Sequence, residues 1–462
     1  MRVLTLLTAV LFPALAMAAE GEAVKTAFVA LGPEGAAYAR VITTADACPS
    51  LMIDGASTPM SIRAQKGTEP LRTTRSDPAD SKPSEFPVLV CDLVLPKNPG
   101  SVMLGEQGLP LPRPVPQRII VVGDTGCRMK KSDKLFQPCN DAEKWPWKGV
   151  ADRAALFKPD LVIHTGDIHY RENACPESEP GCQGSPWGYG FDAFDADLFT
   201  PARNLLNAAP WVFVRGNHES CDRAGQGWWR LLDAHAPVPG QDCNDPANDA
   251  KGEFSDPYAV KIAPDTQLIV FDSSRTGTKI LSETDPLYIA YKRQVDMASQ
   301  IAIAAPNNIF MNHHPILGFA PKATPAGVSF YPGNEGLQSV MERAWPKLLF
   351  PPNVNALFSG HSHVFQMTSF STPHPSQFIS GNAGSWVDDP NFNELPSDAT
   401  PYKDAVVANF TTTNQYGFMT MEREGQDWRM REWDRNGAIL TSCLLAGSKG
   451  KCSPTKVLNG GH

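Results

Sequence analysis

Asp, Asn, His and Tyr side chains recur along this chain in five short signatures, each of which follows an apolar run. The runs are rich in β-branched and aromatic residues, which is typical of buried strands, so each signature is expected where a strand ends. Carboxylate, amide, phenol and imidazole groups are ligands that hard and borderline metal ions prefer. Five such clusters in one chain predict one shared metal site. The signatures are Gly123-Asp124-Thr125-Gly126, Gly166-Asp167-Ile168-His169-Tyr170, Gly216-Asn217-His218-Glu219, Asn312-His313-His314-Pro315 and Gly360-His361-Ser362-His363.

The single signatures differ in how strongly they indicate a ligand. Asp between glycines is an ordinary turn residue, and for Asp124 alone the turn is the favoured interpretation. A second Gly-Asp at Asp167 shifts the balance toward a ligand. His361 and His363 are the strongest local signal, because alternate residues of an extended segment point the same way.

The apolar runs alternate with helical patterns after residue 117, which predicts an α/β layered domain whose ligands gather beyond the carboxyl ends of the strands. Before residue 109, short alternating segments between Gly, Pro and Ser clusters predict a small β-sandwich. In residues 109–116 every second residue is proline, which indicates a stiff linker. The predicted strands are 118–122, 161–164, 211–214, 268–271, 308–311, 354–358 and 377–380, and the predicted helices are 150–157, 227–235 and 286–304.

Composition narrows the possible functions. The chain has 462 residues, which favours two domains. Its net charge of -8 argues against a nucleic-acid-binding surface, although a nucleotide substrate stays possible. We predict a signal peptide at 1–18, a β-sandwich-like domain at 19–108, the linker at 109–117, the domain with the signatures at 118–440 and a disulfide-containing tail at 441–462.

The start of the chain and its cysteines both predict export. Arg2, a short apolar stretch and the cleavage site Ala16-Met17-Ala18 are typical of a signal peptide, and no later segment is long and apolar enough to span a membrane. The ten cysteines form sequential neighbours, for which disulfides are favoured over metal thiolates because no C-x-x-C spacing occurs. The expected location is periplasmic or extracellular. The neighbours are Cys48/Cys91, Cys127/Cys139, Cys175/Cys182, Cys221/Cys243 and Cys443/Cys452.

The order of the signatures resembles that of the calcineurin-like metallophosphoesterase superfamily over about residues 118 to 435. Within it the chain is most similar to the purple acid phosphatase branch, because the first motif is Gly-Asp-x-Gly and Tyr170 stands three residues after Asp167. The resemblance implies an α-β-β-α sandwich, here preceded by the small all-β domain.

The resemblance also implies a dinuclear centre with Fe(III) and Zn, Mn or Fe(II). Asp167 would bridge the two metal ions. His313 is preferred to His314 as a ligand because the family places it two residues before the proline, and His218 would contact the phosphoryl group or the leaving oxygen. One site would hold Asp124, Tyr170 and His363, and the other would hold Asn217, His313 and His361.

The leading hypothesis is a secreted phosphomonoesterase that acts on small-molecule phosphate esters by direct attack of a metal-bound hydroxide. A phosphodiesterase acting on nucleotides or phospholipid head groups is the second hypothesis, and a non-catalytic extracellular binding protein is the third. The family's extra histidines after the His-x-Pro motif are missing from residues 316–331. The acid that protonates the leaving group is therefore left open among His218, His314, His169 and water.

Overall fold

The computed structural model describes residues 23–460 except 77, 326, 390 and 393. The predicted signal peptide, residues 1–18, lies outside the described residues. Among the described residues, no helix is long and apolar enough to cross a membrane.

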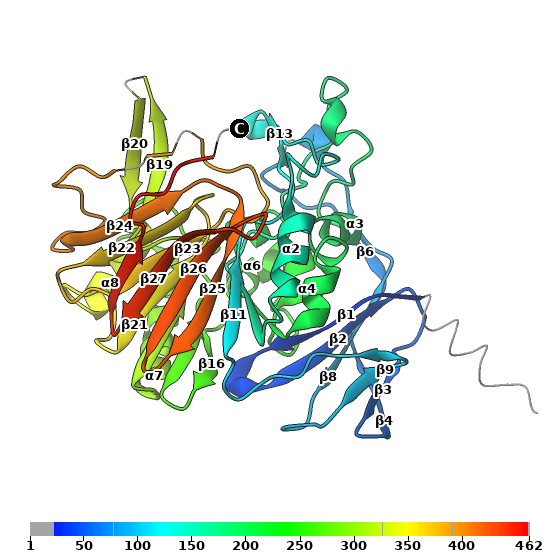
Figure 1. Ribbon diagram of the computed structural model, residues 1–462. Coiled ribbons are helices and arrows are strands. Elements are labelled where there is room, and N and C mark those ends of the chain that lie inside the picture. Colours follow the sequence, from blue (N-terminus) through cyan, green and yellow to red (C-terminus); the bar gives the residue numbers. More distant parts are fainter. Residues whose placement is uncertain (1–22, 77, 326, 390, 393, 461–462) are drawn as a thin grey trace, which may run out of the picture.

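Two β-sheets form the centre of the molecule, and helices cover their outer faces (Figure 1). The larger sheet has the strand order β28-β27-β26-β25-β11-β14-β15-β1-β2-β8-β5, and the second has the order β16-β17-β18-β21-β23-β22-β24. The strands of the larger sheet are β1 Val24–Leu31, β2 Ala37–Thr43, β5 Ser61–Ala64, β8 Leu89–Val94, β11 Arg118–Val122, β14 Leu161–His164, β15 Trp211–Phe213, β25 Gly417–Glu424, β26 Asp427–Asp434, β27 Ile439–Ala446 and β28 Lys449–Ser453. Those of the second sheet are β16 Tyr258–Ala263, β17 Thr266–Val270, β18 Asn307–Met311, β21 Val354–Ser359, β22 Phe365–Phe370, β23 Ser376–Ser380 and β24 Val407–Thr413.

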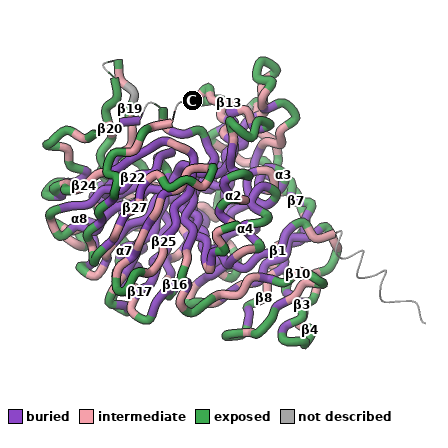
Figure 2. Tube along the Cα trace, viewed as in Figure 1, coloured by how far each residue is buried: buried purple, intermediate pink, exposed green. Residues whose placement is uncertain are grey.

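Three apolar cores separate these layers. One core lies between the sheets and includes Val121 of β11 and Met311 of β18. A second packs α2 (Trp147–Leu156) and α4 (Arg203–Ala208) on the larger sheet. A third packs α7 (Pro286–Ile303) and α8 (Glu335–Ala344) on the second sheet. The order of layers is therefore α-β-β-α, as predicted, and the sheets form the buried centre of Figure 2.

Local sequence explains where these elements begin. Helix α7 has Pro286 in its first turn, and the side chain of Asp285 accepts a hydrogen bond from the backbone N–H of Leu287. Helix α8 begins after Asn334, whose side chain accepts from the N–H of Leu337. The strands that precede the signatures are apolar on both faces because both faces are covered.

The topology brings the ends of the signature strands together. β11, β14 and β15 are parallel neighbours in the larger sheet, and β18 and β21 are parallel neighbours in the second. Each of the five is followed directly by one signature. The carboxyl edges of both sheets therefore carry polar loops.

The N-terminal region is β-rich, as predicted, and its strands continue the larger sheet. β1 pairs with β15 in parallel through Ala30 and Trp211, and β2, β8 and β5 follow outward. A separate four-stranded sheet lies beside them, and the predicted domain boundaries stay a prediction. Its strands are β3 Ser50–Ile53, β4 Ala56–Pro59, β9 Val102–Leu104 and β10 Gln107–Gly108.

Other details differ from the sequence-based expectations. The helical pattern over 227–235 ends earlier, with α5 (Gly225–Gly227) and a wider helical turn over Trp228–Leu232. The stretch 318–333 contains a hairpin of β19 (Phe319–Thr324) and β20 (Gly327–Pro332), and the tail contains β27 and β28. All five predicted disulfides are present. The remaining short elements are α3 Phe191–Phe194, α6 Asp249–Gly252, β6 Gly67–Glu69, β7 Ser84–Phe86, β12 Met129–Lys130 and β13 Leu135–Phe136.

Candidate metal centre

Four of the predicted ligands form one compact group around the Tyr170 hydroxyl. That oxygen lies 3.0 Å from Oδ1 of Asp124, 3.0 Å from Oδ2 of Asp167 and 2.8 Å from Nε2 of His363. Nε2 of His363 is also 3.3 Å from Oδ1 of Asp124. These four side chains come from the loops after β11, β14 and β21.

A second group shares Asp167 with the first. Nε2 of His313 lies 3.1 Å from Oδ2 of Asp167 and 3.1 Å from Oδ1 of Asn217. Nδ1 of His361 lies 3.0 Å from the same Asn217 oxygen. The structure thus brings all seven predicted ligands together.

Within the described residues, two clusters of His and acidic side chains have ligand atoms within 4.8 Å of one another. One contains Asp124, Asp167 and His313, and the other contains His313, His314 and His361. The first cluster spans the two groups above, and the second adds His314 to two members of the second group. The donor set of carboxylate, imidazole, amide and phenol suits one or more metal ions.

The loops reach this arrangement through unusual backbone conformations. Asp124 and Asp167 both have φ of 55°, and His361 has φ of 69°, which is the left-handed region that ordinary side chains rarely adopt. Each such residue costs about 1–3 kcal/mol unless its surroundings hold it in place. The neighbouring glycines are needed because a Cβ at Gly216 would lie 2.1 Å from the Asp167 carboxylate, and one at Gly360 would lie 2.4 Å from that of Asp124.

Two buried carboxylates outside the ligand set hold these loops. Glu219 accepts the backbone N–H groups of Asp167, Ile168, His169 and Gly216 at 2.9–3.1 Å. Asp197 accepts the backbone N–H groups of Cys127 and Tyr170 and the Nε–H of Arg171. Both carboxylates are fully buried, so they join loops that are far apart in sequence.

Backbone carbonyls fix two of the imidazoles. Nδ1 of His363 lies 2.5 Å from the Trp386 carbonyl, and Nδ1 of His313 lies 3.0 Å from the Thr165 carbonyl. A carbonyl only accepts, so each Nδ1 carries a proton, and Nε2 is the ring atom that faces the group. Metal-bound histidines are commonly oriented in this way.

The electrostatics of the group call for added positive charge. Burial raises the pKa of Asp124, and burial together with the two carboxylates raises the pKa of Tyr170 well above its usual value. Burial opposes ionisation of Asp167 too, but the His313 and His218 imidazoles lower its pKa well below the usual value. In turn, Asp167 outweighs burial at His313 and raises the pKa of that imidazole to about 9. A bound cation would replace the imidazolium as the positive partner of Asp167, and it would favour the deprotonated forms of the carboxylates, the phenol and the imidazoles.

The structure separates the three candidate acids. His169 points away from the ligands, with Nε2 2.7 Å from the Gly188 carbonyl. The His314 ring lies 4.2 Å from that of His361, and its Nδ1 is 3.1 Å from the Ser273 hydroxyl. The His218 ring lies 3.9 Å from that of Tyr170, and its Nε2 is 3.8 Å from Oδ2 of Asp167. His218 and His314 therefore border the group, and His169 does not.

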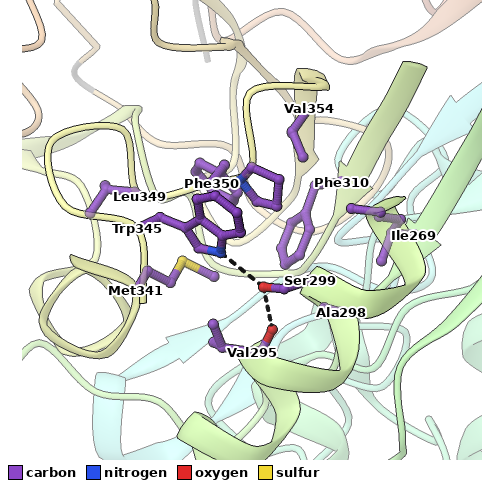
Figure 3. A pocket seen from close by; sticks show the side chains of 12 residues that line it. Ile269, Val295, Ala298, Ser299, Phe310, Met341, Trp345, Leu349, Phe350 and Val354 are labelled. Atoms are coloured by element: carbon purple, nitrogen blue, oxygen red, sulfur yellow. Dashed lines mark hydrogen bonds between the residues drawn. The ribbon is translucent and has the colours of Figure 1, made fainter. Parts of the chain in front are cut away.

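The apolar pocket in Figure 3 is not part of this centre. It lies between α7, α8 and the second sheet and is lined by side chains such as Val295, Phe310 and Met341. Its main polar feature is the Trp345 indole N–H, which donates to the Ser299 hydroxyl at 2.9 Å. None of the signature residues lines it, so it is a packing feature of the third core.

Comparison with known proteins agrees with this geometry. The family model for calcineurin-like phosphoesterases matches residues 117–365, which is more than half of the chain and includes all five signatures. This chain belongs to the calcineurin-like phosphoesterase family. Membership of this family identifies the chain as a metal-dependent phosphoester hydrolase, as the signatures predicted.

This chain is also similar to solved structures, of which a purple acid phosphatase supports the fold. A purple acid phosphatase from yellow lupin (Lupinus luteus) seeds is 14% identical, with a TM-score of 0.51 over 90% of this chain and 73% of that one. The structure of PhoD is 11% identical, with a TM-score of 0.49 over 95% of this chain and 93% of that one. No curated protein matched this phosphoesterase in sequence.

Sequence reasoning missed the residues that brace the site. Glu219 stands inside a signature, so its position carried a signal, but its role as an acceptor for four N–H groups depends on folding. Glu172 and Arg223 follow two of the signatures by two and four residues, and Asp197 stands in the stretch 191–199, but none of the three belongs to a signature. Only their burial and their contacts distinguish them from surface charges.

Glu219→Gln tests this bracing. The amide nitrogen of Gln cannot accept, so two buried N–H groups would lose their acceptor, and the free energy of unfolding should fall by about 2–4 kcal/mol. Chemical denaturation measures this loss. The matched control is Glu394→Gln, because Glu394 is an exposed partner of Lys456 and its loss should change stability little. Equal stability of the two variants would contradict the role of Glu219.

Proposed function

We propose that this phosphoesterase is an exported phosphomonoesterase with two metal ions per chain. The observation that supports the proposal is the arrangement of seven ligand side chains into two groups that share Asp167. Shared carboxylates are typical of two-metal hydrolytic sites.

The ligand assignment follows the two groups. Asp124, Tyr170 and His363 would hold one ion, Asn217, His313 and His361 the other, and Asp167 would bridge them. The first group has mostly oxygen donors, including a phenol, and suits a trivalent iron, whereas the imidazole-rich second group suits Zn, Mn or Fe(II). His314 borders the second group, with its ring 4.2 Å from that of His361.

When bound, the two cations would supply an activated water and neutralise charge on the phosphoryl group. The residues of the chain orient the reactants. His218 borders the group at Asp167, and its Nδ1 lies 2.7 Å from Oε1 of Glu172 while Nε2 lies 3.1 Å from the Arg223 guanidinium. An arginine N–H only donates, so Nε2 of His218 accepts and Nδ1 carries the ring proton. His218 and His314 would contact the phosphoryl or leaving oxygen.

No cysteine thiol is available as a nucleophile, because all ten cysteines are in disulfides. Those five disulfides also support an exported, periplasmic or extracellular protein, since such bonds persist in oxidising compartments. A small-molecule phosphate ester is the proposed substrate.

The alternatives use the same centre. A phosphodiesterase would need a wider approach to the centre, and we expect the loops 318–333 and 387–403 to set that width. A non-catalytic binding protein is disfavoured because every predicted ligand is present and none is displaced from the group.

Comparing kcat/KM for a generic phosphate monoester with that for a matched diester distinguishes between these functions. We expect the monoester to have the higher kcat/KM, and His361→Ala to lower it by at least about 100-fold because the metal loses an imidazole. His235→Ala is the control, since that imidazole pairs with Asp233 away from the centre. Faster diester hydrolysis would favour the second function, and no hydrolysis of either by the metal-loaded protein would favour the third.

The iron assignment depends on Tyr170. Protein loaded with iron should show a visible tyrosinate-to-ferric charge-transfer band that is lost in Tyr170→Phe. Tyr331→Phe is the matched control, because Tyr331 is 52% exposed on β20. A band that persists in Tyr170→Phe, or no band with a full iron complement, would rule out a ferric ion at this tyrosine.

A further inference from the structure

We infer that residues 72–76, an irregular segment of the N-terminal region that we name the strap, position His218 for the proposed reaction. The strap lies outside the 117–365 family match. The inference rests on the proposed function, in which His218 contacts the substrate.

The strap is bound to the loop that follows Asn217 and His218. The backbone N–H of Arg75 donates to the Asp222 carbonyl at 2.9 Å, and its guanidinium donates to the Asp222 carboxylate at 2.8 Å. The same carboxylate accepts the Ser220 hydroxyl at 2.6 Å. The strap therefore holds the 217–223 loop through both backbone and side chain.

Arg72 fixes the other end of the same region. Its guanidinium donates to the Cys243 carbonyl at 2.6 Å and pairs with both oxygens of Asp249. Because Cys243 is bonded to Cys221, the strap contacts both sides of a disulfide-closed loop. This loop follows His218 directly in the chain.

A chain of buried groups leads from the strap to the imidazole. The Ser76 hydroxyl lies 2.7 Å from the Tyr189 hydroxyl, which donates to Oε2 of Glu172 at 3.4 Å. Tyr189 has one hydroxyl proton, so Ser76 donates to Tyr189. The other oxygen of Glu172 lies 2.7 Å from Nδ1 of His218 and 2.6 Å from Arg223.

Burial makes this chain rigid. Ser76, Tyr189, Glu172 and His218 are 8%, 5%, 2% and 4% exposed, so water does not readily replace a lost partner. The Ser76 hydroxyl orients the Tyr189 hydroxyl, which in turn orients the Glu172 carboxylate. That carboxylate contacts the His218 imidazole. Ser76 and Tyr189 are thus positioning residues that act through Glu172.

The test uses the full-length, metal-loaded protein. Ser76→Ala and Tyr189→Phe should each lower kcat by about tenfold, as loss of outer partners commonly does, with KM within about twofold and the metal content unchanged. Ser76→Thr keeps a hydroxyl and should restore most of kcat. Ser57→Ala, an exposed serine on β4, is the control.

The double variant separates positioning from general loosening. If Ser76 acts through Tyr189, the kcat of Ser76→Ala/Tyr189→Phe should equal that of Tyr189→Phe alone. The inference would be overturned if the loss of kcat in the double variant equalled the product of the two single losses. It would also be overturned if Ser76→Ala had the same kcat as Ser57→Ala.

Hydrogen exchange distinguishes this inference from the proposed function. In Ser76→Ala, the backbone amides of 217–223 should exchange faster than in the wild type, whether or not the protein hydrolyses a monoester. Unchanged exchange there overturns the role of the strap. A wild type that hydrolyses no phosphoester would overturn the proposed function. In that case the exchange rates of the 217–223 amides still test whether the strap holds this loop.

Discussion

The site depends on the burial of two carboxylates, Asp124 and Asp167, which both contact the Tyr170 hydroxyl. Asp124 and Asp167 are at most 1% exposed, and the described side chains in contact with them are Tyr170 and imidazoles, with no lysine or arginine among them. Burying such charges without a compensating partner costs far more than the fold can readily offset. Bound cations would resolve this conflict, and the other proposed ligands lie close enough to contribute to their coordination.

The fold supplies this arrangement at the meeting of two sheets. Parallel strands end at one edge, so short loops from β11, β14, β15, β18 and β21 converge there without long excursions. The loops adopt left-handed conformations at Asp124, Asp167 and His361, and Glu219 and Asp197 hold them by accepting backbone N–H groups. Strain at the ligands is thus balanced by buried hydrogen bonds around them.

The grouping of the predicted ligands was largely predictable because these residues follow strands with strong local signals. β11 and β14 have the predicted limits, and all seven predicted ligands converge. Long-range pairing was not predictable: nothing local to Ala30 indicates that β1 pairs with β15, and nothing local to Met419 indicates that β25 pairs with β11. The Glu172–Arg223 pair was missed for the same reason, since its partners come from separate loops.

Metal analysis of protein produced in an oxidising compartment tests the central claim most directly. The account predicts about two tightly bound metal ions per chain, with Asp167→Asn losing most of both because both groups share that carboxylate. A wild type that binds one ion or none under metal-replete conditions would contradict it. So would an Asp167→Asn variant that keeps both ions.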